Sequence, residues 1–136
     1  FSLTLKNLYY NFLPLISPTR KNITTFLKKA VFFGDHHMVS EAAFRMIVDF
    51  ELFAITQYTD KTQKPYGMKG SELERVDSDV YLIVGENDLL FPWKKSVEAA
   101  QSHLVNLKEV HLLQQTGHGI ETSPEAMALL AEIMAK

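Results

Sequence analysis

The sequence predicts a mixed α/β fold, with helices first and a small parallel sheet after them. Two mostly apolar runs, residues 80–84 and 109–113, predict strands, and a helical pattern over 93–105 joins them. A strand, a helix and a second strand in this order are typical of parallel strands that are buried on both faces. The preceding residues show helical spacing and no two-residue period. We therefore expect a helical segment over 1–67 and a sheet-containing segment over 68–136.

Three or four helices are expected before the sheet. Apolar residues at helical spacing over 1–13 predict the first, which Pro14 and Pro18 should stop. Thr19 is a candidate N-cap for the second. The third should begin near Asp35 and either continue through the apolar residues that follow or be succeeded by a fourth. The second helix has the clearest apolar stripe, formed by Ile23, Phe26, Leu27 and Ala30.

A connector over 59–70 leads to the sheet segment. The helix over 93–105 should have Pro92 in its first turn, and a glycine-flanked histidine turn at 117–119 follows the second strand. Ser123 is a candidate N-cap for a last helix. That helix should have Pro124 at its first position and bury Ala126, Leu129, Leu130, Ile133 and Met134. Two strands leave both edges of a parallel sheet open, so either another segment adds strands or this part is not independently stable.

Composition limits the class of protein. Fourteen basic and 16 acidic residues give a net charge of -2, which is too balanced for nucleic-acid binding through phosphate neutralisation. The longest uncharged stretch near the start, residues 7–19, is shorter than the ~18 apolar residues of a membrane span, so no membrane association is expected. Cysteine is absent, which excludes disulfides, cysteine-ligated zinc and a thiol nucleophile and makes the reducing cytoplasm the expected location.

Most of the histidines have contexts that do not favour chemistry. His103 and His111 fall in a helical and a strand pattern, where packing or solvation is the expected role. The run Asp35, His36 and His37 contains metal-ligand types, but adjacent helical residues point ~100° apart and no third ligand follows at helical spacing. No metal site is therefore expected.

The residues best suited to chemistry come directly after the two strands. Asp88 follows the first, where it could be a turn residue or an acid, and Glu86 competes with it for the second role. His118 lies between Gly117 and Gly119, which should let its backbone adopt conformations denied to other residues and its ring project past the sheet. A carboxylate and an imidazole in this order look like the acid and base of a Ser-His-acid triad.

The nucleophile of such a triad is not recognisable in the chain. It usually occupies the turn G-x-S-x-G, and none of the eight serines has the flanking glycines.

Two stretches resemble a known family. Residues 80–92, with the turn Gly-Glu-Asn-Asp, and residues 116–125, with Gly-His-Gly, resemble the last two strands, acid turn, histidine turn and final helix of the α/β-hydrolase fold family. The resemblance covers 68–136, and the helical residues 1–67 are similar to the cap that this family inserts before the acid-bearing strand. It implies that the chain is the C-terminal part of an α/β-hydrolase, whose nucleophile strand and oxyanion-hole loop would lie upstream of Phe1.

The resemblance also implies a function. With Asp88 as the acid and His118 as the base, the parent would be a cofactor-independent serine hydrolase of the capped carboxylesterase type, cleaving an ester or related acyl bond. Its substrate would be small and apolar, with Phe91 and Ile120 as guesses for pocket walls. Its necessary partner would be the missing N-terminal half, so the isolated chain should be inactive and poorly soluble. Two alternatives stay open: a dehalogenase-like enzyme with an aspartate nucleophile, and a non-catalytic binding relative.

Overall fold

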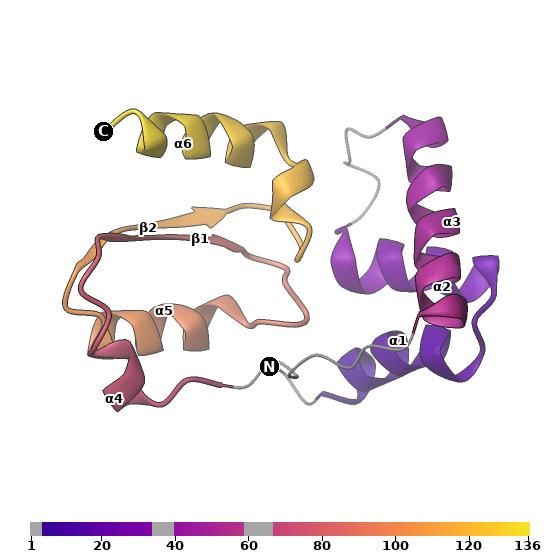
Figure 1. Ribbon diagram of the computed structural model, residues 1–136, viewed down its shortest axis with the longest axis horizontal. Helices are drawn as coiled ribbons and strands as arrows, with labels where there is room; N and C mark the ends of the chain where they lie inside the picture. The colour runs from indigo at the N-terminus through magenta and orange to yellow at the C-terminus, as the bar shows by residue number, and fades with distance from the viewer. Residues whose placement is uncertain (1–3, 34–39, 59–66) are drawn as a thin grey trace.

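The computed structural model describes residues 4–33, 40–58 and 67–136. The elements are α1 (Leu5–Ile16), α2 (Arg20–Phe26), the π-helical turn η1 (Leu27–Val31), α3 (Glu41–Gln57), α4 (Gly70–Leu73), β1 (Val80–Gly85), α5 (Trp93–His103), β2 (Leu107–Leu113), the 3-10 turn η2 (Ile120–Thr122) and α6 (Pro124–Met134). Helices α1, α2 and α3 group together beyond the end of the sheet toward which β2 points (Figure 1). The mixed α/β class, with helices preceding a small parallel sheet, is confirmed.

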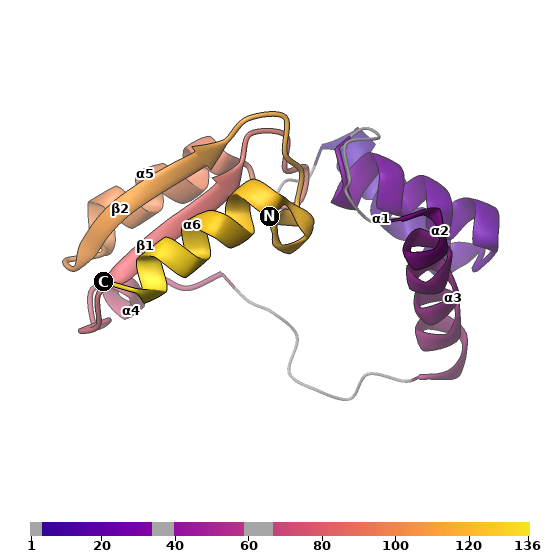
Figure 2. The same cartoon turned by 90° about the horizontal axis from the view of Figure 1, so that it is seen from above.

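The sheet has the predicted strand–helix–strand form. Strands β1 and β2 pair in parallel, with Tyr81 opposite Glu109 and Gly85 opposite Leu113. Helices α5 and α6 lie on opposite faces of the pair, as both views show (Figures 1 and 2). Within the described residues the sheet has these two strands, so both outer edges are open, and most of the strand side chains are only half-buried.

The helical group has an apolar core of its own. Ile23, Leu27, Phe32 and Val48 are buried together, and Phe26, Val31, Phe44, Ile47, Leu52 and Ile55 pack around them. The predicted stripe of the second helix is confirmed, although its last turn winds as a π-helix. Helix α3 runs unbroken to Gln57, so the alternative of a fourth helix in this stretch is wrong.

Two of the expected caps are present. The Thr19 hydroxyl accepts the Asn22 N–H (3.2 Å) at the start of α2, and the Ser123 hydroxyl accepts the Ala126 N–H (3.4 Å) at the start of α6. Pro124 takes the first position of α6, where a missing N–H costs nothing. Local side-chain chemistry therefore sets where these helices begin.

Several boundaries differ from the prediction. Helix α1 continues through Pro14 to Ile16, because a proline in the last turn removes one donor while the Ser17 N–H still bonds to the Leu13 carbonyl (3.1 Å). Pro92 is the N-cap of α5 and not part of its first turn. Ser40 caps α3, while Asp35, the predicted cap, and residues 59–66 of the connector lie outside the described residues. The proposed boundary between 67 and 68 stays a prediction.

The predicted buried stripe of α6 is only partly right. Ala126 is buried and Leu129 and Ile133 are half-buried, but Leu130 and Met134 are 40% and 79% exposed. The apolar stripe of α6 is wider than a two-stranded sheet can cover, so Leu130 and Met134 face away from the strands. None of the helices in the described ranges combines the length and apolarity needed to cross a membrane.

Candidate active site

The site begins with two turns that are tied together where the strands end. The Glu86 N–H bonds to the Leu113 carbonyl and the Asn87 N–H to the Thr116 carbonyl, both at 2.9 Å. These bonds carry the strand pairing past β1 and β2. The turn that holds Asp88 therefore lies directly against the turn that leads to the histidine.

The Asp88 carboxylate is fixed by its own turn. Its Oδ1 accepts the N–H groups of Leu90 (2.7 Å) and Phe91 (2.9 Å), which leaves Oδ2 facing the neighbouring turn. The side chain is only 10% exposed. Asp88 is therefore a turn residue, and the same backbone bonds orient its second oxygen.

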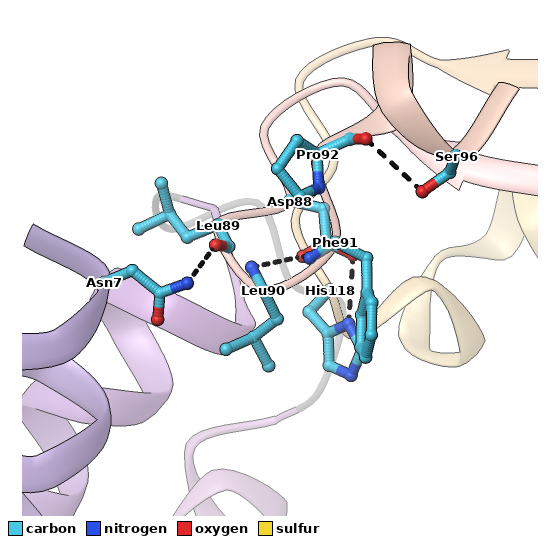
Figure 3. A network of polar contacts seen from close by, with 8 residues as sticks. All are labelled: Asn7, Asp88, Leu89, Leu90, Phe91, Pro92, Ser96 and His118. Atoms are coloured by element: carbon cyan, nitrogen blue, oxygen red, sulfur yellow. Dashed lines mark hydrogen bonds and ion pairs between the residues drawn. The ribbon is translucent and has the colours of Figure 1, made fainter. Parts of the chain in front are cut away.

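His118 meets that second oxygen. Its Nδ1 lies 3.0 Å from Asp88 Oδ2, while the other ring nitrogen points away from the carboxylate (Figure 3). The imidazole is 38% exposed, and the ring of Phe91 lies alongside it at a centroid distance of 5.3 Å. The structure therefore brings together the two residues proposed for catalysis, whose chemical roles stay a prediction.

The contact changes the proton affinity of the imidazole. The hydrogen bond to Asp88 raises the pKa of His118, against the opposing effect of partial burial, and the charges of Asp88 and Glu121 add to the rise. A raised pKa means that the imidazolium, relative to the neutral ring, is more stable in the folded protein than in an ordinary exposed histidine. The contact with Asp88 thus stabilises the protonated form of His118.

The glycines of the two turns permit close approach. A Cβ on Gly85 would lie 2.3 Å from the Gly117 carbonyl oxygen, and one on Gly119 would lie 2.6 Å from the Phe32 ring. Gln115 is the one non-glycine residue with a positive φ in the described part of the chain, so His118 has an ordinary backbone, and Gly119 has φ -76°, a value open to any residue. The expectation that the flanking glycines give the His118 backbone a conformation denied to other residues is therefore wrong, because what matters is their missing side chains.

An apolar cavity of about 270 Å³ adjoins the pair. Its lining consists of Leu82, Ile83, Val84, Gly85, Asp88, Phe91, Ser96, His118 and Ile120. The two residues proposed as pocket walls, Phe91 and Ile120, thus both line it. Ser96 also lies in the wall, but its hydroxyl donates to the Pro92 carbonyl of its own helix (3.3 Å) (Figure 3).

The other sequence candidates lie elsewhere. Glu86, the competing acid, is exposed and its carboxylate accepts the Gln115 N–H at 3.5 Å. His103 pairs with Glu74 (3.1 Å) and His111 with Glu109 (2.9 Å). The doubtful metal cluster at 35–37 lies outside the described residues.

Two contacts from the helical group were not foreseen. The side chain of Asn7 donates to the Leu89 carbonyl in the acid turn, and the Gly119 N–H donates to the Val31 carbonyl at 3.0 Å. Each joins residues more than 80 positions apart in the chain, so no local sequence pattern signals them. An asparagine among the apolar residues of α1 was the only hint, and it resembles an ordinary surface position.

Comparisons with models of protein families, with curated proteins and with solved structures return no match for this chain. The features of the chain that bear on function are those of the site itself: a fixed carboxylate, an imidazole oriented by it, and an apolar cavity at the carboxyl ends of parallel strands.

Proposed function

We propose that this chain carries the acid and the general base of a serine hydrolase of the carboxylesterase type, in the C-terminal part of an α/β-hydrolase-like fold. The observation that carries the proposal is the 3.0 Å contact between His118 Nδ1 and Asp88 Oδ2. A carboxylate bonded to Nδ1 fixes the tautomer in which Nε2 is the free acceptor. Nε2 is then the atom that can take a proton from a nucleophile.

The reaction follows from these roles. His118 Nε2 accepts the proton of a serine hydroxyl as its oxygen forms a bond to the acyl carbon, and Asp88 stabilises the resulting imidazolium. The imidazolium then gives that proton to the alcohol oxygen as the ester C–O bond breaks. A water molecule repeats the sequence, with His118 again accepting and returning the proton, and releases the acid.

The serine would come from outside these 136 residues. None of the eight serines lies in the turn that activates this nucleophile. Ser96 lines the cavity, but its hydroxyl points to the Pro92 carbonyl. We accordingly expect these residues alone to show no esterase turnover.

The substrate would be small and apolar. Phe91 and Ile120 line the cavity beside the imidazole, and a volume of about 270 Å³ suits a short acyl or alcohol group. Helices α1, α2 and α3 stand over the same end of the strands, the position from which a cap would close such a pocket (Figure 1).

The test is active-site labelling of the full-length natural protein with a fluorophosphonate probe, which reacts with serines activated by a general base. We expect labelling, and its loss in His118→Ala. The matched control is His103→Ala, because His103 has a similar exposure (39%) and also contacts a carboxylate. A protein that takes up no probe would contradict the proposal and favour one of the two alternatives, an enzyme with an aspartate nucleophile or a non-catalytic relative. Labelling that persists without His118 would contradict the role of His118 as the base.

A further inference from the structure

We infer that Asn7 is a positioning residue for the Asp88–His118 pair, through which the N-terminal helical group holds the acid turn in its working geometry. The inference deepens the proposed function, and the catalytic role of Asn7 rests on that proposed function. The contact between Asn7 and Leu89 does not rest on it, because the contact can be measured without any reaction.

Asn7 has a surrounding unlike that of the other polar residues of α1. Its side chain is 0% exposed and donates from Nδ2 to the Leu89 carbonyl, which lies in the sheet segment (Figure 3). Its Oδ1 accepts the side-chain amide of Asn11, so both ends of the carboxamide are occupied. A buried amide costs stability unless it is hydrogen-bonded, so the partner across the interface fixes how α1 seats on the acid turn.

The Leu89 carbonyl is directly linked to the Asp88 carboxylate. It belongs to the same peptide unit as the Leu90 N–H, which donates to Asp88 Oδ1 at 2.7 Å. A peptide unit is planar, so an anchor on its oxygen also orients its N–H. The resulting series runs from Asn7 through one peptide group to Asp88 and on to His118 (Figure 3). Hydrogen bonds in series polarise one another, which strengthens each.

A second contact joins the same helical group to the other turn. The Val31 carbonyl at the end of η1, a position where helix carbonyls lack an internal partner, accepts the Gly119 N–H at 3.0 Å. The Phe32 ring packs where a Cβ of Gly119 would lie. The helical group therefore touches both the residue after the acid and the residue after the base. A shift of this group would disturb both turns at once.

The test measures the pKa and tautomer of His118 by ¹⁵N NMR in protein that carries Asn7→Asp or Asn7→Leu. Neither side chain can donate to Leu89, and leucine adds no charge. In Asn7→Leu we expect the His118 pKa to fall most of the way to its value in Asp88→Asn. In Asn7→Asp the added negative charge acts against this fall. The matched control is Asn22→Asp, because Asn22 also donates to a carbonyl (Ser17, 2.8 Å) but within the helical group. It should leave the pKa of His118 as it is.

Two results would overturn the inference. One is an unchanged His118 pKa in Asn7→Leu while circular dichroism shows the helices of that variant intact. The other applies even if the variants lose their helices, because it uses the unsubstituted protein. A scalar coupling between Asn7 Nδ2 and the Leu89 carbonyl carbon, across their hydrogen bond, should be detectable there, and its absence would contradict the contact. Neither result depends on fluorophosphonate labelling, so failure of the inference and failure of the proposed function can be told apart.

Discussion

The sheet has a histidine–carboxylate pair at each end, and the two pairs have similar distances but different surroundings. His118 and Asp88 lie 3.0 Å apart where the strands end, and His103 and Glu74 lie 3.1 Å apart near where they begin. The two imidazoles are 38% and 39% exposed. The carboxylates are not alike, because Asp88 is 10% exposed and Glu74 is 55% exposed.

The difference shows that a short contact is not enough to make a site. Asp88 is held by two backbone N–H groups and by a turn pressed against the histidine turn. Glu74 follows the short helix α4, and its direct contact with His103 is exposed to solvent, where side-chain entropy and screening leave an ion pair that contributes little to stability. Preorganisation of the carboxylate distinguishes the candidate site from an ordinary surface pair.

The largest expected contrast is in ester turnover by the full-length protein. Asp88→Asn keeps an oxygen for the backbone bonds but can present an amide to His118 Nδ1, which favours the wrong tautomer. We expect kcat to fall by about 10⁴-fold, the scale known for this kind of change in serine proteases. Glu74→Gln, the same change at the other end, should leave kcat near wild type. Equal losses from the two variants would remove the distinction between the pairs.

The next contrast concerns the glycines beside each pair. In Gly85→Ala the new Cβ would lie 2.3 Å from the Gly117 backbone carbonyl, so the two turns must separate. In Gly70→Ala it would meet the His103 ring at 2.4 Å, and an exposed side chain can move aside. We expect Gly85→Ala to lower the free energy of unfolding by about 1–3 kcal/mol, and Gly70→Ala to change it by less than ~0.5 kcal/mol. Urea denaturation of both variants measures this, and the reverse order would contradict the close packing of the turns.

A smaller effect should appear in the pH dependence of stability. The folded-state pKa of His118 is raised above the unfolded value of 6.5, so its contribution is complete below that pH and is lost as pH rises through the folded pKa. The stability difference between wild type and Asp88→Asn should therefore be larger at pH ~5.5 than at pH ~8.5. Denaturation curves at both values check the sign. A difference that grows with pH would mean that Asp88 does not favour the imidazolium.

The smallest effect concerns Glu121. Its charge is the last and weakest of the causes that raise the pKa of His118. Glu121→Gln should lower that pKa by less than Asp88→Asn does. Salt at ~0.5 M should remove most of the pKa difference between wild type and Glu121→Gln, since Glu121 is exposed and such a charge is screened within a few ångströms at that ionic strength. NMR titration at low and high salt separates the two carboxylates. If Glu121→Gln lowered the His118 pKa as much as Asp88→Asn does, the assignment of Asp88 as the acid would be contradicted.

Much of the local structure could be predicted from the sequence because its signals are local. Strand β1 and the cap of α6 at Ser123 follow from short-range patterns, and the order of strand, helix and strand fixes the parallel pairing. The proximity of Asp88 and His118 follows in turn, because parallel strands that are neighbours end at one edge of the sheet.

The rest depended on packing between distant parts of the chain. The contact of Asn7 with Leu89 has no counterpart in any local pattern, and the exposure of Met134 depends on how narrow the sheet is. The role of Gly119 was misjudged for the same reason, since the Phe32 ring that excludes a side chain there comes from the helical group. Local patterns could place the reacting groups but not what holds them.

The central claim is that Asp88 holds the His118 imidazole with Nδ1 protonated and Nε2 free to accept a proton. Long-range ¹H–¹⁵N NMR of the histidine rings, recorded above the His118 pKa, tests it most directly. We predict that neutral His118 is the Nδ1–H tautomer and that Asp88→Asn abolishes this preference. A neutral His118 with its proton on Nε2 in the unsubstituted protein would contradict the account.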